Sequence, residues 1–380
     1  MIAVGLHVAC GIAARNGDNR STKSSGGTSM GTGLRGRASV AAAGIAFGMG
    51  LAARVAPPRK AEADLRGTVA LVTGGSRGLG LALSRELAQQ GCRLAICARN
   101  ESELETARID LQLQAFGAEV LAVPCDVSDQ SQVATMVETV TQHYGRIDIL
   151  INNAGIMLVA PVETLTSADF ERVMAINFWG VLNPTLAVLP GMRARGAGRI
   201  VNITSIGGKI AVPHLLPYSC AKFAAVGLSE GLRSELADTG ISVTTVVPGL
   251  MRTGSHLHAE FGGEQEAEYR WFALGASAPY PVAIGADRAA RLIVRAVKRG
   301  EAECTYPVSA VVAARLSGLV PSATTNVLAL VDRFLPRPAR QGAGTRTGAA
   351  VEAEIDAPLL RAATVLGRSA AAEYKQVRPS

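Results

Sequence analysis

A tyrosine and a lysine lie one helical turn apart past the middle of the chain, in the stretch "PYSCAK" at residues 217–222. At this spacing of four residues, the side chains of Tyr218 and Lys222 project from the same face of a helix. If that face lines a pocket, the ammonium group lowers the pKa of the phenol from its usual value of about 10 and makes it a usable acid. If the face points to water, the two residues are only a surface pair.

A serine offers a third reactive group nearby. Ser205 lies thirteen residues before Tyr218 and directly follows the apolar run "RIVNIT" at residues 199–204. By itself, a serine at the end of a strand is usually a turn or cap residue. If the run is a strand of a parallel sheet, its carboxyl end brings Ser205 to the rim of a pocket, opposite the helix that carries Tyr218.

Six short runs rich in β-branched and apolar residues predict the strands that must position these groups. Helical periodicity separates them, as in Leu79, Leu83 and Leu87 before Gly91. Strands that are apolar throughout have both faces of their sheet covered. We therefore expect one main α/β domain, a doubly wound Rossmann-type parallel sheet flanked by helices. The predicted strands are 68–73, 93–98, 119–124, 148–152, 199–204 and 241–247.

A glycine-rich turn, "TGGSRGLG" at residues 73–80, follows the first predicted strand. Gly74, Gly78 and Gly80 allow a tight turn and a close approach to a pyrophosphate, and the following helix points free N–H groups at it. The spacing differs from G-x-G-x-x-G, and glycines also serve ordinary β–α turns. Its place after the first strand of a βαβ series favours dinucleotide binding, with Ser76 and Leu79 in the same turn.

Two arginines favour NADP(H) over NAD(H). A cofactor with a free ribose 2′-hydroxyl usually meets an acidic residue at the end of the second strand, but this chain has Arg99 there and Arg77 in the glycine-rich turn. Two guanidinium groups suit a 2′-phosphate, although either arginine alone is more often a solvated surface charge.

Residues after the third, fourth and sixth strands complete the expected cofactor site. Asp126 could accept a hydrogen bond from an adenine amino group or could cap a turn, and the asparagines of "NNAG" could brace neighbouring strands as well as line the cofactor. The remaining residues expected at the cofactor are Val127, Asn153, Ala154, Gly155, Pro248, Gly249 and Thr253.

Together these motifs resemble the short-chain dehydrogenase/reductase family over residues 65–307. TGxxxGxG, NNAG, a serine after the fifth strand, YxxxK and PG occur here in that family's order and spacing. The family also has a catalytic asparagine in its fourth helix, which Asn177 of "VMAINFWG" matches.

The resemblance implies a metal-free hydride transfer that interconverts a ketone or aldehyde and an alcohol. Tyr218 would be the acid or base, Lys222 would lower the pKa of Tyr218 and bind the nicotinamide ribose, and Ser205 would bind the substrate oxygen. Asn177 would hold a water that supplies protons to Lys222. The resemblance also implies a homo-oligomer formed through the fourth and fifth helices.

Residues 250–283 are expected to cover the pocket as a lid. Their apolar and aromatic residues favour a lipophilic substrate, although the same side chains could instead pack the lid or a subunit interface. Two other functions remain open for this fold: an NADP sensor without turnover, and a membrane-tethered scaffold. The apolar residues concerned are Leu250, Met251, Phe261, Trp271, Phe272, Leu274 and Tyr280.

The distribution of charge argues against nucleic-acid binding. The 380 residues carry a net charge of +7, but residues 1–64 hold eight Lys/Arg against three Asp/Glu, and residues 336–380 hold seven against four. The middle of the chain is therefore close to neutral and offers no basic stripe. The six cysteines are scattered, which predicts neither disulfides nor a zinc site and favours a reducing, cytoplasmic location.

Two extensions flank the predicted domain, at residues 1–64 and 308–380. Within the first, residues 38–53 form an uncharged stretch shorter than the ~20 residues of a comfortable membrane span, so membrane association through it is a weaker alternative. The second predicts two helices within 308–335, a linker at 336–350 and a last helical stretch at 357–374. That last stretch could dock on the domain, a partner or a membrane.

Overall fold

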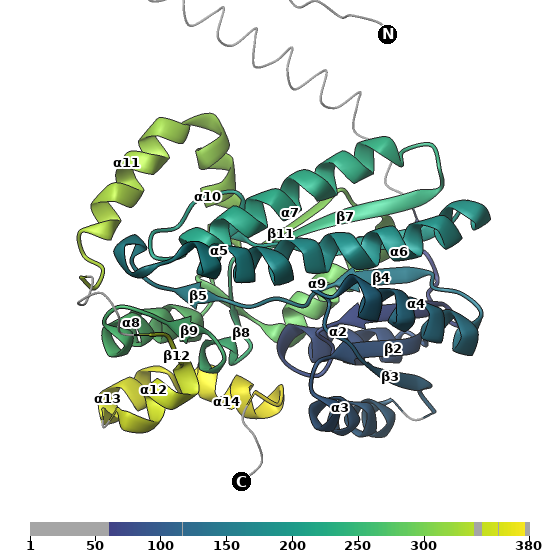
Figure 1. Cartoon of the computed structure of the whole chain (residues 1–380), viewed down its shortest axis with the longest axis horizontal. Coiled ribbons are helices and arrows are strands. Elements are labelled where there is room, and N and C mark those ends of the chain that lie inside the picture. Colours follow the sequence, from purple (N-terminus) through teal and green to yellow (C-terminus); the bar gives the residue numbers. More distant parts are fainter. Residues whose placement is uncertain (1–60, 116, 338–343, 356, 377–380) are drawn as a thin grey trace, which may run out of the picture. The chain divides into compact units, whose positions relative to one another are not determined.

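The computed structural model describes residues 61–115, 117–337, 344–355 and 357–376, and its centre is one parallel sheet (Figure 1). Seven strands follow the order β11-β7-β6-β4-β1-β2-β3, and every neighbouring pair is parallel. The strands are β1 (Val69–Thr73), β2 (Arg93–Ala98), β3 (Val120–Pro124), β4 (Ile149–Asn152), β6 (Gly198–Ile203), β7 (Ile241–Pro248) and β11 (Glu303–Tyr306).

All six predicted strands occur, each within two residues of its expected bounds. The seventh, β11, was not predicted. Its sequence "ECTY" is short and begins with a charged residue, so it lacks the apolar run that marks the others. β11 pairs only with β7 and closes that edge of the sheet.

The direction of the strand order reverses between β1 and β4. β2 and β3 lie on one side of β1, whereas β4, β6, β7 and β11 follow on the other. At such a reversal, the connections leave for opposite faces of the sheet and open a crevice at the carboxyl ends of the strands. The glycine-rich turn after β1 and the "NNAG" stretch after β4 therefore lie at the same crevice.

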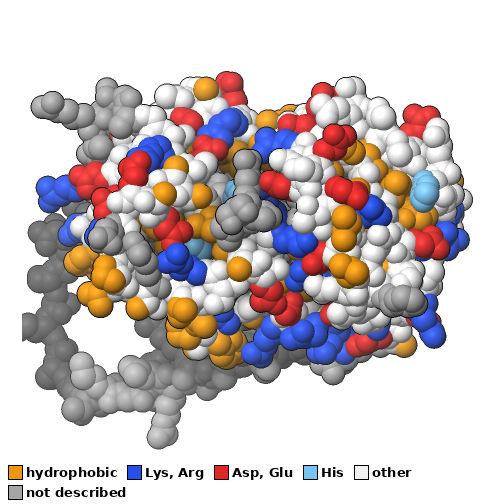
Figure 2. Space-filling model, turned by 90° about the horizontal axis from the view of Figure 1, so that it is seen from below, with side chains coloured by type: hydrophobic (Ala, Val, Ile, Leu, Met, Phe, Trp, Pro, Cys, Tyr) orange, Lys and Arg blue, Asp and Glu red, His pale blue; other side chains and the backbone are white. Residues whose placement is uncertain are grey.

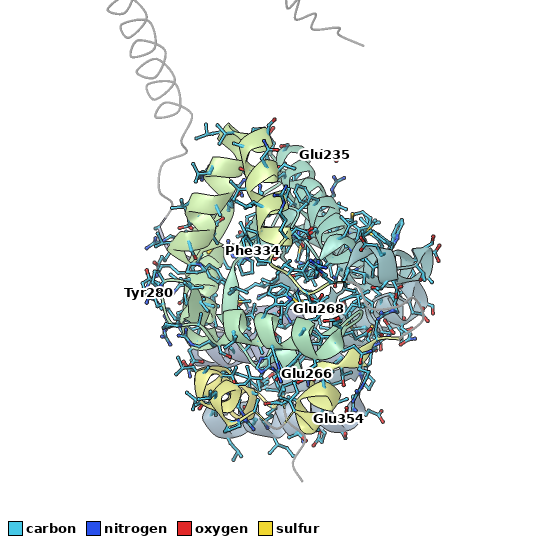
Figure 3. The ribbon with its side chains drawn as sticks, turned by 90° about the vertical axis from the view of Figure 1, so that its left-hand side faces the viewer. Glu235, Glu266, Glu268, Tyr280, Phe334 and Glu354 are labelled. Carbon is cyan, nitrogen blue, oxygen red and sulfur yellow. The ribbon has the colours of Figure 1, made fainter. Side chains whose placement is uncertain are left out.

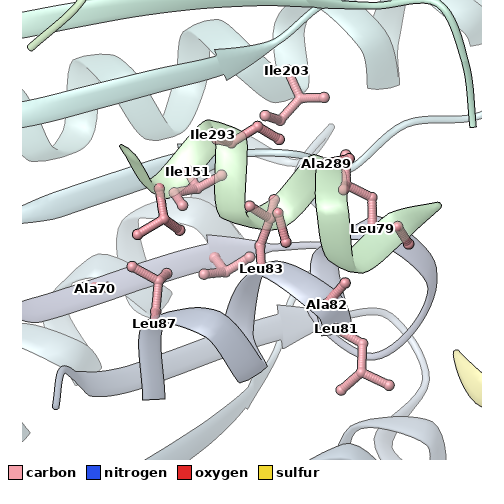
Figure 4. Close-up of a cluster of buried hydrophobic side chains, with 14 of the residues drawn as sticks. Ala70, Leu79, Leu81, Ala82, Leu83, Leu87, Ile151, Ile203, Ala289 and Ile293 are labelled. Carbon is pink, nitrogen blue, oxygen red and sulfur yellow. The ribbon is translucent and has the colours of Figure 1, made fainter. Parts of the chain in front are cut away.

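Alternate residues of each strand enter different cores, which is the physical basis of the two helical layers. Ala70 and Val72 of β1 pack towards one face, and Val69 and Leu71 pack towards the other. The first core includes α2 (Gly78–Gln89), α3 (Glu101–Gln114) and α9 (Ala286–Arg299), as Figure 4 shows in part. The second includes α4 (Gln130–Tyr144) and α6 (Gly180–Arg195), beside α7 (Leu216–Glu235).

One long helical segment carries the expected catalytic asparagine. It runs from α5 (Ser167–Met174) through a π-helical turn, η2 (Ala175–Trp179), into α6. Among the described residues, Ser167–Arg195 is the one helix long and apolar enough by composition to cross a membrane. This segment contacts β4, α4 and α7 of the domain. A helix in the core of a soluble protein can have the same length and composition and packs in the same way. Residues 38–53 lie outside the described residues.

The expected lid is a small layer beside the main sheet. It contains α8 (Gln265–Ser277), the parallel pair β8 (Leu250–Arg252) and β10 (Ala283–Gly285), and β9 (Glu260–Phe261) next to β5 (Leu158–Val159). The C-terminal extension adds to this layer, because β12 (Arg346–Thr347) pairs with β9, and α12 (Gly348–Glu354) and α14 (Val365–Glu373) pack against α8.

The C-terminal extension is thus docked on the domain. Its first part forms the two helices expected, α10 (Val308–Leu319) and α11 (Pro321–Asp332). The last helical stretch is divided at Thr364 into α13 (Pro358–Ala363) and α14. Figure 2 looks from below onto the side where α12, α13 and α14 lie, and shows acidic and basic side chains intermingled, without a basic stripe on that face.

The contact between α2 and α9 should be the most sensitive to truncation, because Leu83 and Ile293 are both fully buried in it. We expect Leu83→Ala to lower the free energy of unfolding by ~2–5 kcal/mol, since it removes buried apolar atoms and leaves a cavity. Leu113→Ala on α3 is the control, because Leu113 is 79% exposed and should cost under ~0.5 kcal/mol. Urea denaturation of both variants measures the difference, and equal losses would contradict this assignment of the core.

Candidate active site

The end of β6 and the start of α7 bring Ser205 and Tyr218 together. Ser205 follows β6 and is 9% exposed; its Oγ accepts a hydrogen bond from the Gly207 N–H at 3.0 Å and lies close enough to the Tyr218 phenol to lower its pKa. A Cβ atom at Gly207 would lie 3.2 Å from the Tyr218 ring. The glycine two residues after Ser205 therefore leaves room for the Tyr218 ring beside the serine.

Lys222 lies behind Tyr218 on the same face of α7, as its spacing predicts. Its side chain is buried, and Nζ lies 5.7 Å from the centroid of the Tyr218 ring. Nζ donates a hydrogen bond to the Ile203 carbonyl at 2.9 Å, which ties α7 to the end of β6. Burial lowers the pKa of Lys222 to about 8, because a low-dielectric surrounding disfavours the charged ammonium group.

The pKa of Tyr218 differs from the sequence expectation in direction. Burial raises it, and only the hydrogen bond with Ser205 acts to lower it. Lys222 does not lower it here, because its ammonium group points to the Ile203 carbonyl. The phenol is therefore protonated at neutral pH, which is the form that can donate a proton.

Asn177 lies fully buried in the π-helical turn and holds the backbone after "NNAG". Its Oδ1 accepts from the Ile156 N–H at 2.9 Å, and its Nδ2 donates to the Ile156 carbonyl at 2.8 Å. A Cβ at Gly155 would lie 3.0 Å from Asn177 Oδ1 and 3.8 Å from Lys222 Nζ, so this glycine separates the two side chains. Both polar atoms of the Asn177 side chain are thus used structurally.

The glycine-rich turn has the backbone that a pyrophosphate site needs. Gly74 and Gly78 have φ angles of +63° and +57°, which L side chains rarely adopt. A Cβ at Gly80 would lie 2.0 Å from the Gly74 carbonyl oxygen, so only glycine fits there. Ser76 and Leu79 are buried in the turn. These residues fit a dinucleotide at the N-terminus of α2.

The turn is fastened to the end of β4. The Thr73 hydroxyl accepts hydrogen bonds from the Asn153 and Ala154 N–H groups at 2.9 and 3.1 Å. The Asn153 side chain in turn donates to the carbonyls of Thr73 and Gly74. Asn153 therefore braces neighbouring strand ends, as one of its two expected roles requires.

The two arginines expected at a 2′-phosphate have different surroundings. Arg77 pairs with Glu103 of α3, with 3.0 Å between Nη1 and Oε2, whereas Arg99 is exposed at the end of β2. A phosphate at this position would have to share the Arg77 guanidinium with a carboxylate. Glu103 gave no signal in the sequence, because its role depends on the distance between α2 and α3.

Asp126 and Val127, after β3, have clear structural roles. The Asp126 carboxylate accepts from the Ser128 N–H and hydroxyl at 2.9 and 2.7 Å, which is the turn role left open by the sequence. Val127 is buried and lies against Gly180, where a Cβ would come within 2.6 Å of it. Neither contact prevents Asp126 from also meeting an adenine, since it is only partly buried.

The expected nicotinamide side of the site follows β7. Pro248 ends the strand, and the Gly249 N–H donates to the Tyr306 carbonyl at 2.6 Å. A Cβ at Gly249 would lie 2.9 Å from Ala310 Cβ, so the glycine admits the start of α10. The Thr253 hydroxyl is buried and accepts from the Ser255 N–H at 3.3 Å, which caps the turn that follows.

Sequence reasoning missed a buried chain of polar groups beneath the site. Asn152 donates to Asn202 at 2.9 Å, Asn202 donates to the Ser229 hydroxyl at 3.0 Å, and Thr245 bonds the same hydroxyl at 2.7 Å. Asn152 also donates to Thr185 of α6. The chain links β4, β6 and β7 to α7. The only signal for this chain in the sequence was a polar residue inside each of the apolar runs that predict these strands.

The lid holds a second buried polar group, on the side of the molecule drawn in Figure 3. Glu268 of α8 is fully buried, although Glu266 one half-turn away is exposed. Its two oxygens bond His214 Nδ1 and Trp271 Nε1, each at 2.7 Å. His214 lies four residues before Tyr218 and has an unusual φ of +62°. Glu268 therefore ties the lid to the loop that leads into the catalytic helix.

Phe261 and Phe272 are buried in the apolar cluster of the lid, together with Tyr269. Of the two roles open for these aromatics, packing of the lid is the one the structure assigns to Phe261 and Phe272. Leu274 and Tyr280 are exposed. Met157, Val212 and Trp271 instead remain partly exposed and pack, as Tyr218 does, against this cluster.

Comparison with known proteins agrees with this geometry. Residues 68–260, about half of the chain, match the model of the short chain dehydrogenase family. A "Dehydrogenase/reductase SDR family protein 7-like" from Anopheles gambiae is 36% identical over 264 residues, covering 68% of this chain and 81% of that protein. Levodione reductase superposes with a TM-score of 0.56 at 30% identity, over 64% of this chain and 96% of that one.

A second solved structure, NAD+-bound xylitol dehydrogenase, has a TM-score of 0.54 at 26% identity, over 63% of this chain and 98% of that one. The chain therefore belongs to the short-chain dehydrogenase/reductase family. As a member it is an oxidoreductase with a fold that binds a nicotinamide cofactor, and it acts on carbonyl or alcohol groups of a small molecule.

The pKa of Lys222 predicts a pH limit on carbonyl reduction. The ammonium form is lost as the pH rises through about 8, so kcat/KM for reduction should be flat below that value and fall about tenfold per pH unit above it. Lys209→Ala is the control, because Lys209 pairs with Glu230 away from Tyr218. A limb that first appears between about pH 9.5 and 10.5, the ordinary range for lysine, would contradict the assignment.

Proposed function

We propose that this protein reduces a lipophilic ketone or aldehyde to an alcohol, and catalyses the reverse oxidation, with NADP(H) as its preferred cofactor. The proposal rests on one observation above all: the Tyr218 phenol is protonated, lies close to Ser205 and has Lys222 behind it at the carboxyl end of β6. When bound, the nicotinamide supplies or accepts the hydride.

The residues of this chain have separate tasks in that reaction. In reduction, Tyr218 donates its proton to the substrate oxygen, and the Ser205 hydroxyl donates a hydrogen bond to the same oxygen, where negative charge develops. The Lys222 ammonium, held by the Ile203 carbonyl behind the Tyr218 ring, would bind the nicotinamide ribose. Asn177 fixes the backbone beside Lys222 and, through its own carbonyl, positions a water that returns the proton. In oxidation the proton moves in the opposite direction.

A lipophilic substrate is supported by an apolar wall that shares its underlying cluster with Tyr218. Met157, Val212 and Trp271 are partly exposed in this wall and pack, as Tyr218 does, against the apolar cluster of the lid. An apolar molecule would gain about 25 cal/mol for each Å² of surface that it buries against such a wall. Phe261 and Phe272 contribute to the rigidity of the lid and not to this wall.

We also propose a homo-oligomer formed through the helices that the resemblance implies. Trp179 at the end of η2, Leu186 of α6 and Phe223 of α7 are 49%, 51% and 44% exposed. Large apolar side chains on neighbouring helices favour an interface over a solvated surface. α7 contacts α5 and η2, which lead into α6.

Turnover of apolar ketones and aldehydes by the purified full chain tests the reaction, followed as NADPH oxidation. Tyr218→Phe keeps the ring but removes the proton donor, so we expect kcat to fall by ~10²–10⁴ while NADPH binding is retained. Tyr144→Phe, a buried tyrosine of α4 that bonds the Leu94 carbonyl, is the matched control and should keep kcat. Full activity of Tyr218→Phe would refute the mechanism. NADPH binding without turnover of any carbonyl compound would favour the sensor function.

The cofactor preference has its own test in the Arg77–Glu103 pair. Arg77→Ala should raise Kd for NADPH by roughly 10–100-fold, the value of a hydrogen bond to a charged group, and leave Kd for NADH nearly unchanged. Glu103→Gln should act in the opposite direction, because it removes a carboxylate that competes with the phosphate for Arg77. Arg108→Ala is the control, because Arg108 lies on α3 with Glu103 but pairs with Glu105. Equal losses for both nucleotides in Arg77→Ala would show that Arg77 only supports the turn.

A further inference from the structure

The last turn of the described chain lies on the glycine-rich turn. The Gly78 N–H, at the first residue of α2, donates to the Tyr374 carbonyl at 2.9 Å. The Gln376 side chain lies against Gly78, where a Cβ would come within 2.4 Å of Gln376 Nε2. In Figure 1 the end of α14 accordingly faces the first helices of the domain, α2 and α3.

These contacts use the same groups that a pyrophosphate would use. A phosphate at a helix N-terminus accepts hydrogen bonds from the free N–H groups of the first turn. The Gly78 N–H has one hydrogen and already donates it to Tyr374. The missing side chain of Gly78 leaves room for a close neighbour, and that neighbour is Gln376. The tail and a dinucleotide therefore compete for one surface.

The tail is held by a specific structure. Gln376 N–H bonds the Ala371 carbonyl, and Lys375 N–H bonds the Ala372 carbonyl, which is the pattern of a Schellman cap on α14. The residue that must be left-handed in such a cap is usually glycine, but here it is Lys375, with a φ of +54°. Its side chain donates to the Thr106 carbonyl at 2.9 Å and lies 3.5 Å from Asp110. A strained lysine is thus fixed on α3.

Further contacts surround the turn. Gln376 is 7% exposed, and its carbonyl accepts a hydrogen bond from His258 Nε2 at 2.9 Å. Arg85 of α2 donates to the Glu373 carbonyl. Among the described residues, however, Gln376 Oε1 has no hydrogen-bond partner although it is buried. An unpaired buried acceptor weakens the docked state, so a ligand can displace it.

The helix before the turn is anchored separately. Gly254 admits the backbone of Ala371, with 2.4 Å between a Cβ at Gly254 and Ala371 Cα. Gly367 lies in the same way against Ser277 of α8. α14 can therefore stay on the lid while the turn after it leaves Gly78.

We propose that residues 374–376 are an intramolecular competitor of the dinucleotide: they occupy the phosphate-binding turn and must leave it before the cofactor binds. This inference rests on the proposed cofactor site. The docked fraction reduces the apparent affinity for any nucleotide with a pyrophosphate, because binding must first release the turn. The effect is equal for NADPH and NADH, which separates it from the 2′-phosphate contact of Arg77.

The full-length chain tests this with a double substitution, Lys375→Ala with Gln376→Ala, which removes the anchors on α3 and Gly78. We expect Kd for both NADPH and NADH to decrease by roughly 3–10-fold, as fluorescence titration would measure. Arg368→Ala is the control, because Arg368 lies on the same helix but pairs with Glu352. A thermal melt of each variant checks that the domain remains folded.

Hydrogen exchange provides the second readout. In the wild-type chain, saturating NADPH should speed hydrogen exchange of the Lys375 and Gln376 amides, which form the cap after α14. The amides of α14 itself should stay protected. Unchanged nucleotide affinity together with unchanged hydrogen exchange would overturn the proposal. Slower exchange would overturn it too, because it would show that the tail closes over the bound cofactor. If neither nucleotide binds to the wild type or to the double variant, the proposed cofactor site itself fails and this inference with it.

Discussion

The hydrogen bonds between Thr73 and Asn153 are the interaction on which the site depends. It joins the ends of β1 and β4, the two strands between which the sheet reverses its order. One hydroxyl accepts two backbone N–H groups, and one amide donates to two carbonyls, so polar groups at the crevice are paired without side chains that would fill it. The glycine-rich turn and the stretch after β4 are thereby held together at the reversal of the strand order.

Burial then sets the protonation states of Tyr218 and Lys222. The same low-dielectric surrounding raises the pKa of Tyr218 and lowers that of Lys222 to about 8. At neutral pH the phenol keeps its proton and most of the lysine keeps its charge. This combination suits proton donation to a carbonyl oxygen, and it arises from position more than from a direct contact between the two groups.

The C-terminal extension connects the lid with the phosphate-binding turn. β12 and α12 complete the lid, α14 crosses beneath it, and the turn at Tyr374 to Gln376 reaches Gly78. Glycines at the close contacts, Gly254 and Gly367, show that this path is part of the packing. A segment added after the catalytic domain thus meets both the substrate side and the cofactor side of the crevice.

The sequence alone determined the six strands, the parallel sheet, the glycine-rich turn and the spacing of Tyr218, Lys222 and Ser205, because these depend on local periodicity and spacing; Asn177 came from the family resemblance. Only the tertiary structure decided what depends on distance between remote segments. Glu103 meets Arg77, Glu268 meets His214, and Gln376 meets Gly78, and no local pattern encodes such pairs. The strand β11 and the direction of the pKa shift of Tyr218 belong with them, since pairing and burial are properties of the folded chain.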